Sequence, residues 1–423
     1  MSPAPDDALL RGAVWLDLTR LLTRAGRGAP TGIDRVELAW FDHLSAANSW
    51  LMCLCRTTRG FLLLPPGVAR AIVDVVRGTT GLGRADLWSR ATGRGARPRH
   101  RAEAMVRHGA ADRCPPWGLA GMIRRHGPDA YLNVGHANLR DRVLGAFQDA
   151  GTDVVVLVHD LIPVLHPDLV PPDQPGVFAA RIDAVARHAS LVATVSGDTR
   201  ASLERHWSSR DRSPPVVAVP IGIPAIPPAG PPEREAGRFL MIGTLEPRKN
   251  HATLLKAWSL LAGEFPKWDM PQLHILGNEG WQGDAIRREI EGHDLFGTAI
   301  FLGGGVHDDA LAEQMRRADA LLYPSLAEGF GLPPWEALDA GLLPICSDLP
   351  VLRELLGARA VYVDPTDVYS WAETVRQRAR GGLEMPVGAM PDRPRWQEHF
   401  AGVARALAEV RQAGRLTGQK GRE

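Results

Sequence analysis

The sequence predicts an α/β protein made of two open, doubly wound sheet domains. Short apolar runs alternate with amphipathic helical patterns along most of the chain, as they do in parallel sheets covered by helices. A proline-rich segment divides this alternation into two halves. At 423 residues the chain is also too long for one ordinary hydrophobic core. We therefore expect two Rossmann-like domains with a ligand cleft where their strand ends face each other.

The N-terminal half, residues 1–223, shows this alternation in a less regular form. Its candidate strands are residues 13–18, 50–55, 130–134, 154–159, 191–195 and 216–219. Its candidate helices are residues 33–45, 177–188 and 199–207. We predict one Rossmann-like domain for this half.

Residues 224–237, PAIPPAGPPEREAG, form the clearest boundary. Proline at this density excludes both a helix and a central strand, so the segment is predicted to be an interdomain linker.

The C-terminal half, residues 238–385, alternates more regularly. Its strand candidates are residues 238–243, 273–277, 299–303, 318–324, 342–348 and 360–364. Helical patterns separate them at residues 250–262, 308–317, 334–340, 350–355 and 367–378. A second Rossmann-like domain is predicted here, followed by an amphipathic helix over residues 395–413.

Composition narrows the functional classes. The formal net charge of +1 disfavours a nucleic-acid-binding protein, whose surface is strongly basic. The first residues, MSPAPDDALL, lack the basic segment followed by an apolar stretch that is typical of a signal peptide, so none is expected. No apolar run reaches the roughly 20 residues that span a bilayer. The four cysteines have no metal-binding spacing and are interpreted as free thiols in a reducing compartment: Cys53, Cys55, Cys114 and Cys346. We expect a cytoplasmic protein, with at most peripheral contact at the inner face of the membrane.

Residues 84–113 are rich in arginine and poor in acids. This segment is interpreted either as a solvated insertion or as a surface that attracts anionic lipid or an anionic acceptor.

The segment LLYPSLAEGFGLPPWEALDAG ends a predicted strand, crosses a loop and begins a helix. Glu328 falls in the loop and Glu336 in the first turn of the helix, beside the crevice where open α/β sheets bind ligands. The backbone of Gly329, Phe330 and Gly331 is able to approach a phosphate or a sugar hydroxyl closely. Taken alone, each acid favours a simpler interpretation: Glu336 as a residue that complements the helix dipole, and Glu328 as an exposed loop acid.

The segment GTLEPRKN, from Gly243 to Asn250, follows the first strand of the same half. A turn with Asn250 as helix N-cap directs Arg248 and Lys249 into the same crevice. Two cations there suit a pyrophosphate, whose departure they would stabilise. Considered alone, an arginine–lysine pair in a loop is more typical of a solvated surface.

Together, EGFGLPPWE and GTLEPRKN resemble the retaining glycosyltransferases of the GT-B fold, family four (glycosyltransferase group 1). The resemblance covers most of residues 238–378. It implies that Arg248 and Lys249 bind the donor diphosphate and that Glu336 holds the ribose hydroxyls. It places Glu328 at the transferred sugar as a catalytic residue.

The same resemblance implies further donor contacts. Gly243 and the backbone of Gly329, Phe330 and Gly331 would lie against the sugar and phosphates, and the loop that carries Val306 would contact the base.

Two segments of the N-terminal half agree with this resemblance. APTGIDRVE places Gly32 at the start of a helix, where a diphosphate or acceptor approaches, and is similar to a loop of transferases, often mannosyltransferases, that build bacterial polysaccharides. Asp34 stands in it where glutamine is frequent. VVVLVHDLIP ends a strand at His159, which we expect to face the sugar, beside Asp160 as a further candidate. Ser196 is interpreted as a helix cap with a possible role in the cleft.

The resemblance implies a retaining transferase that moves a hexose from a nucleotide diphosphate sugar to a saccharide or lipid-linked acceptor. It favours mannose as the hexose and GDP-mannose as the donor. The chain contains no D-x-D triplet, so neither a metal nor another cofactor is expected. Two alternatives stay open: a catalytically silent partner subunit that binds nucleotide sugar, and another enzyme on this fold such as a sugar-nucleotide epimerase or a phosphorylase.

Overall fold

The computed structural model describes residues 12–28, 30–83, 97–223 and 232–420. The chain forms two compact units. The first consists of Met1–His159, Val177–Gly222 and Pro394–Glu423, and the second of Asp160–Gly176 and Ile223–Arg393. Each unit is described by itself.

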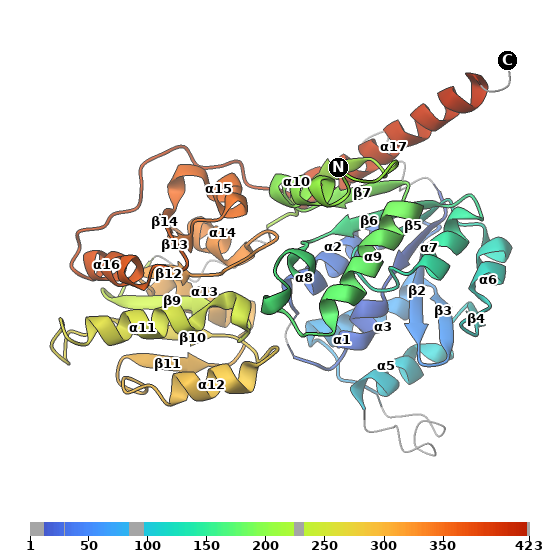
Figure 1. The fold of residues 1–423 in the computed structure, drawn as a ribbon. Helices are drawn as coiled ribbons and strands as arrows, with labels where there is room; N and C mark the ends of the chain where they lie inside the picture. The colour runs from blue at the N-terminus through green and yellow to red at the C-terminus, as the bar shows by residue number, and fades with distance from the viewer. Residues whose placement is uncertain (1–11, 29, 84–96, 224–231, 421–423) are drawn as a thin grey trace. The chain divides into compact units, whose positions relative to one another are not determined.

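An eight-stranded sheet forms the centre of the first unit, with the strand order β4-β3-β2-β1-β5-β6-β7-β8 (Figure 1). The strands are β1 Val14–Asp17, β2 Met52–Thr57, β3 Gly60–Leu64, β4 Asp112–Cys114, β5 Ala130–Asn133, β6 Asp153–Val158, β7 Leu191–Thr194 and β8 Val216–Ala218. Neighbouring strands are parallel, apart from the antiparallel pairs β2–β3 and β3–β4 at one edge. The six strands predicted for this half are all present, and β3 and β4 are additional.

Helices surround this sheet. They are α1 Thr19–Arg24, α2 Gly32–Ala47, α3 Pro66–Arg77, α5 Pro98–Arg107, α6 Leu119–His126, α7 Asp141–Gln148, α9 Gln174–His188, α10 Gly197–His206 and α17 Trp396–Lys420. Gly60 begins β3 with a φ of 135°, and a Cβ there would lie 2.0 Å from the carbonyl oxygen of Cys114. Glycine at this position therefore allows the close approach of β3 and β4.

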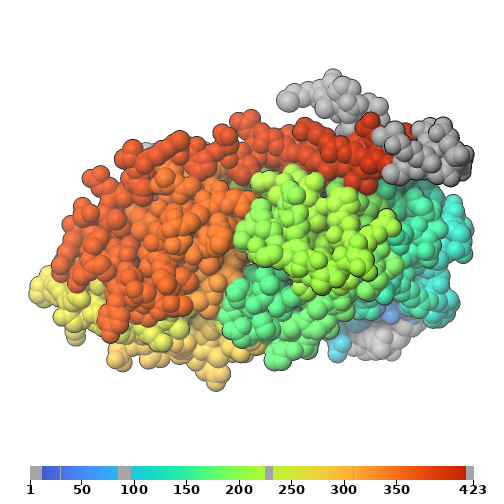
Figure 2. Space-filling model, turned by 45° about the horizontal axis from the view of Figure 1, so that its top comes forward, coloured from blue at the N-terminus to red at the C-terminus, as the bar shows by residue number. Residues whose placement is uncertain are grey.

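The C-terminal helix α17 packs on the first unit. The indole Nε1 of Trp40 donates a hydrogen bond to Nε2 of His399 at 3.1 Å, and Arg411 forms an ion pair with Asp153 at 2.6 Å. Figure 2 shows α17, in red, at the molecular surface. The last helix thus belongs to the same unit as β1, although the two elements lie at opposite ends of the sequence.

The second unit contains a fully parallel six-stranded sheet with the order β11-β10-β9-β12-β13-β14 (Figure 1). Its strands are β9 Arg238–Ile242, β10 Gln272–Leu276, β11 Ile300–Gly303, β12 Ala320–Tyr323, β13 Leu343–Ser347 and β14 Val361–Val363. Its helices are α8 Ile162–Leu165, α11 His251–Leu261, α12 Gly283–Glu291, α13 Asp308–Arg317, α14 Leu332–Asp339, α15 Pro350–Leu356 and α16 Val368–Ala379. Short 3-10 turns occur at Pro167–Leu169, Pro247–Lys249 and Gly357–Arg359.

Both faces of this sheet are covered by apolar side chains. One face packs around the fully buried Trp258 and Trp371, and the opposite face around Leu240, Met315 and Leu321. Burial on both faces explains why these strands read as continuous apolar runs in the sequence.

The boundaries differ from the prediction in two places. Asp160–Gly176 was predicted to belong to the N-terminal domain but groups with the second unit. The end of the predicted linker is attached to the second unit, because the Arg234 guanidinium donates to the carbonyl oxygens of Ala318 at 3.1 Å and Ala340 at 3.0 Å. Residues 224–231 of that linker lie outside the described residues.

Residues 84–96 of the arginine-rich segment also lie outside the described residues. In the part that is described, Arg99 forms an ion pair with Glu103 at 3.1 Å. The four cysteines are free thiols, as predicted. Within the described ranges, no helix combines the length and the apolar character that a membrane crossing requires.

Candidate active site

A tight turn between β9 and α11 places two cations at the carboxyl edge of the second sheet. Asn250 occupies the N-cap position of α11, as predicted, but does not cap it with its side chain. It adopts a left-handed conformation with φ of 58°, and its amide donates to the carbonyl oxygens of Pro324 at 3.0 Å and Pro365 at 2.9 Å. Asn250 therefore joins this turn to the loops after β12 and β14.

Glu328 lies between the two cations. Its carboxylate forms ion pairs with Arg248 at 2.7 Å and with Lys249 at 2.6 Å. The Glu328 side chain is only 8% exposed. The prediction of a cluster is thus confirmed for these three residues, and the exposed-loop interpretation of Glu328 is wrong.

Three further groups fix the cations. Arg248 also pairs with Glu246 at 2.5 Å and donates to the carbonyl oxygen of Ala327 at 3.1 Å. The Lys249 ammonium donates to the hydroxyl of Tyr323 at 2.7 Å and lies 4.5 Å from the centre of the Tyr323 ring.

The ionisation of these groups follows from their contacts. Burial opposes the ionisation of Glu328, but the charges of Arg248 and Lys249 outweigh it and lower its pKa to about 2. Burial lowers the pKa of Lys249 despite the Glu328 carboxylate. The site therefore holds an ionised carboxylate paired with two cationic side chains.

The helix after this loop begins earlier than predicted. Gly331 occupies the N-cap position, and α14 starts at Leu332. The φ of Gly331 is 100°, a left-handed backbone conformation that glycine adopts without strain. Glu336 therefore lies beyond the first turn of the helix, in which it was predicted to lie. It is buried on a helix that packs against β12 and β13. Gly329 and Phe330 are also buried in the loop that precedes this helix.

The loops after β9, β10 and β11 meet at the same edge of the sheet. A Cβ on Gly243 would lie 3.2 Å from the Lys249 side chain, and a Cβ on Gly277 would lie 1.8 Å from the Gly243 carbonyl oxygen. The Asn278 side-chain oxygen accepts the backbone N–H of Gly305 at 3.2 Å. Val306, predicted to neighbour the base, follows directly and is partly buried against the core.

In the first unit, the predicted Gly32 is the first residue of α2 and is exposed. Asp34 fixes this helix start: its carboxylate accepts the backbone N–H of Thr31 at 2.8 Å. It also pairs with Arg20 at 3.0 Å and Arg24 at 3.1 Å. Asp34 is thus a buried structural anchor of the predicted loop.

His159 is buried at the end of β6. Its Nε2 lies 2.7 Å from the Val134 carbonyl oxygen, so this nitrogen carries the proton and Nδ1 is the acceptor. Burial lowers the pKa of His159 to about 4, and the ring is neutral at physiological pH. Its backbone N–H donates to the His136 ring at 3.2 Å.

The two remaining candidates have local partners. Asp160 accepts the backbone N–H of Ile162 at 3.0 Å, and burial raises its pKa. Ser196 caps α10 by accepting the backbone N–H of Thr199 at 3.1 Å, as predicted.

Tyr323 and Glu246 contact the cations but were not among the predicted site residues. Tyr323 is the last residue of β12 and Glu246 belongs to GTLEPRKN, so both positions border the predicted crevice. A buried tyrosine hydroxyl usually has a hydrogen-bond partner, so a tyrosine at the end of a buried strand is a sequence signal for a polar site there.

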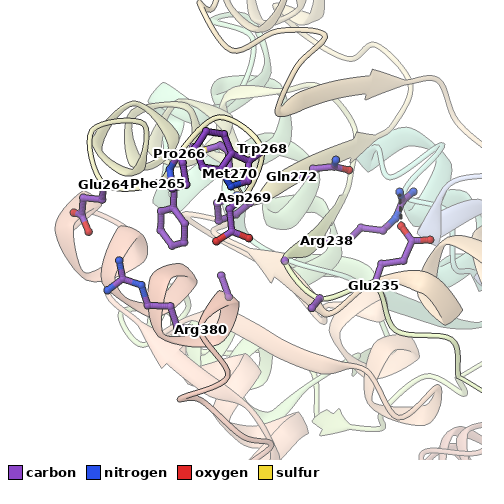
Figure 3. Close-up of a pocket in the computed structure, with 14 residues that line it drawn as sticks. Glu235, Arg238, Glu264, Phe265, Pro266, Trp268, Asp269, Met270, Gln272 and Arg380 are labelled. Atoms are coloured by element: carbon purple, nitrogen blue, oxygen red, sulfur yellow. Dashed lines mark hydrogen bonds and ion pairs between the residues drawn. The ribbon is translucent and has the colours of Figure 1, made fainter.

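A pocket of about 460 Å³ lies elsewhere in this unit and contains none of the predicted residues. It borders the amino ends of β9 and β10, where Arg238 and Gln272 begin the two strands (Figure 3). Trp268, 90% exposed, lies at its rim. Since the cations lie at the carboxyl ends of the strands, this pocket is separate from the predicted site.

Comparison with known proteins gives a sequence match over part of the chain. Residues 224–383 match the family described as glycosyl transferases group 1. The serotype-specific mannosyltransferase WbdA of Escherichia coli is 29% identical over 246 residues, which cover 53% of this chain and 30% of WbdA. The O-antigen chain mannosyltransferase B of Escherichia coli is 30% identical over 255 residues, 57% of this chain and 61% of that protein. The chain thus matches less than two thirds of either relative.

Among solved structures, sucrose-phosphate synthase from Thermosynechococcus elongatus aligns with a TM-score of 0.56 at 16% identity. The alignment covers 96% of this chain and 98% of that one. This likeness concerns the fold, and it confirms the predicted α/β, GT-B architecture.

Proposed function

We propose that the chain transfers a hexose from a nucleoside diphosphate sugar to a saccharide or lipid-linked acceptor, because residues 224–383 match the family described as glycosyl transferases group 1. The observation that carries this proposal is the convergence of Arg248 and Lys249 on Glu328 at the carboxyl edge of the second sheet. Ligands of open α/β sheets bind at this edge.

In this proposal the diphosphate of the donor binds Arg248 and Lys249. Both side chains already lie in a buried site, where their charges act in a low effective dielectric. A diphosphate brings the acceptor oxygens that match a guanidinium and an ammonium group. Glu336, buried on α14, is the proposed partner of the ribose hydroxyls.

The proposed reaction proceeds on one face of the donor sugar. The acceptor hydroxyl oxygen forms a bond to the anomeric carbon while the bond from that carbon to the phosphate oxygen breaks. The hydroxyl proton passes to the departing phosphate, and the anomeric configuration is retained. Arg248 and Lys249 stabilise the negative charge of the leaving group, and Glu328 stabilises positive charge at the anomeric carbon.

This assignment gives the two cations the electrostatic role that a divalent metal has in other transferases, so activity is proposed not to need a metal. Mannose is the proposed sugar, because the curated relatives above are mannosyltransferases. GDP-mannose is accordingly the proposed donor.

The test is an assay of nucleoside diphosphate release and sugar transfer with GDP-, UDP- and dTDP-sugars, with and without EDTA. We expect release from GDP-mannose, transfer to a mannose-terminated acceptor, and an α-linked product by proton NMR, all unaffected by EDTA. Binding of a donor without release or transfer would instead identify a silent nucleotide-sugar-binding subunit. A β-linked product would contradict retention.

A further inference from the structure

A buried polar cluster in the first unit lies at the carboxyl ends of β1 and β5. Asp17 is the last residue of β1, and Asn133 is the last residue of β5. The Asp17 carboxylate accepts hydrogen bonds from the Tyr131 hydroxyl at 2.7 Å and from the Asn138 amide at 2.7 Å. The Asn133 amide donates to the Tyr131 hydroxyl at 2.9 Å. These contacts form one continuous network.

The network leaves two amide oxygens without a donor. The Asn138 nitrogen contacts the Asp17 carboxylate and, at 2.8 Å, the Thr19 hydroxyl, while the Asn133 nitrogen also contacts the Ala137 carbonyl oxygen. Carboxylate and carbonyl oxygens only accept hydrogen bonds, which fixes the orientation of both amides. Consequently both Oδ1 atoms are buried acceptors that receive no hydrogen bond from the described residues.

Glu37 adds two more buried oxygens without a hydrogen-bond partner among the described residues. It lies on α2, its side chain is fully buried, and neither carboxylate oxygen accepts a hydrogen bond from the described part of the chain. The Arg20 Nε lies 3.9 Å from the Glu37 Oε2. This N–H group donates its hydrogen bond to Asp34 instead, at 3.0 Å. A Cβ on Gly135 would lie 2.3 Å from Oε1, so glycine is what leaves room for this carboxyl group.

Buried acceptors without donors are rare in folded proteins, because their lost hydration is not replaced. Here four buried oxygens without a hydrogen-bond partner among the described residues occur on three side chains around one strand-end cluster. The surroundings include the carboxylates of Asp17 and Asp34, so an anionic ligand is a poor match. A ligand with several O–H donors and no charge matches the missing donors.

We propose that Glu37, Asn133 and Asn138 form a subsite that binds hydroxyl groups of the acceptor saccharide. This proposal rests on the proposed glycosyltransferase function and assigns acceptor recognition to these three residues. The loop from Gly135 to Asn138 borders the subsite, since Gly135 lies against the Glu37 carboxyl group and Asn138 belongs to the network. It holds two non-glycine residues in the left-handed region, His136 with φ of 58° and Asn138 with φ of 56°. The proposal requires this loop to change its conformation when the acceptor binds, because the oxygens are buried.

The cluster also predicts a proton exchange on binding. Burial raises the pKa of Glu37 well above its usual value; Arg20 opposes this rise, and Asp34 and Asp17 add to it. The Cys55 thiol also neighbours this site, and burial keeps it protonated. Acceptor hydroxyls that donate to Glu37 stabilise its ionised form, so a protonated Glu37 is expected to release its proton when the acceptor binds.

The experiment uses the full-length protein with GDP-mannose as donor and α-linked mannotriose as acceptor. In Glu37→Gln we expect KM for mannotriose to rise at least tenfold while the slow hydrolysis of donor without acceptor stays unchanged. Calorimetry in two buffers of different ionisation enthalpy should show proton release on mannotriose binding to the wild type and none in Glu37→Gln. The matched control is Glu103→Gln, a buried glutamate whose oxygens accept hydrogen bonds from Thr58.

Gly135→Ala is a second variant. Its methyl group displaces the Glu37 carboxyl group without changing the chemistry of Glu37, so this variant should also raise KM for mannotriose. The proposal is overturned if both variants keep the wild-type KM, or if Glu103→Gln raises KM as much as Glu37→Gln. If the wild type releases no nucleoside diphosphate from any donor, the proposed function fails separately. Binding of mannotriose by saturation-transfer NMR then decides the subsite, and equal binding by wild type and Glu37→Gln overturns it.

Discussion

Replacing Glu328 with glutamine tests the centre of the second unit most sharply. The variant keeps the size of the side chain but removes the carboxylate that pairs with Arg248 at 2.7 Å and Lys249 at 2.6 Å. Two neighbouring cations then remain in a buried site without their shared counter-charge. We expect a folded protein of lower stability and much lower turnover.

Two physical quantities give the expected loss of stability in Glu328→Gln. The pKa of Glu328 is lowered from 4.5 to about 2, which corresponds to about 3 kcal/mol of stability at neutral pH. Breaking a buried ion pair by removing one partner costs roughly 3–5 kcal/mol. Because the folded pKa is the lower one, this contribution is complete above pH 4.5 and is lost as the pH falls toward 2.

The assay is denaturant unfolding of wild type and Glu328→Gln at several pH values between 3 and 7, together with steady-state kinetics at neutral pH. Turnover should fall roughly 100-fold or more, as when a group that stabilises transition-state charge is removed, while donor binding stays largely intact. Glu313→Gln is the control, since Glu313 pairs with Arg316 on the surface of α13, and it should unfold like the wild type.

Two results would refute this reasoning. Unchanged turnover in Glu328→Gln removes the residue from the mechanism. Equal unfolding free energies of the variant and the wild type at pH 7 would show that the two ion pairs do not hold the site together.

Three further substitutions test how the fold positions the sites. Gly331→Ala places a Cβ on a residue with φ of 100° and within 2.7 Å of the Leu352 side chain. The melting temperature of the variant should drop by an amount equivalent to roughly 1–3 kcal/mol, and an unchanged value would contradict the need for glycine at this position. Trp258→Ala empties the centre of the second core and removes a 2.8 Å hydrogen bond to the Pro271 carbonyl, and urea unfolding should show a loss of roughly 3–5 kcal/mol; a loss below about 1 kcal/mol would argue against this core. Asp34→Ala removes the partner of two arginines and of the start of α2, so urea unfolding should show a loss of roughly 2–3 kcal/mol, and a stability equal to the wild type would contradict its role as an anchor.

The second sheet was predictable because its strands are buried on both faces and therefore appear as uninterrupted apolar runs. β3 and β4 were not predicted: they pair antiparallel at one edge, and β4 is only three residues of mixed polarity, Asp112–Cys114. α12, over Gly283–Glu291, was missed because most of its surface is polar. The short, mixed-polarity β4 and the polar α12 thus lack a clear sequence pattern. β3, over Gly60–Leu64, is fully buried and apolar, so its sequence did carry the signal of a buried strand.

The candidate site was predictable to the extent that its residues belong to continuous motifs. Arg248, Lys249 and Glu328 follow strand ends in two such motifs, and parallel strands bring those ends to one edge. The burial of the Glu37 carboxyl group was not predictable, because its oxygens lie against Gly135, which is far away in the sequence. Only the folded chain shows that none of the described residues donates a hydrogen bond to this carboxyl group.

The central claim is that Arg248 and Lys249 hold the diphosphate of an activated sugar. Calorimetric titration of GDP-mannose, UDP-glucose and dTDP-glucose into the wild type and Lys249→Met measures this directly. We predict that GDP-mannose binds the wild type and that its affinity falls at least tenfold in Lys249→Met, since a buried ammonium group within 2.6 Å of Glu328 is lost. Equal affinity of the two proteins, or no binding of any of the three donors, would contradict the account.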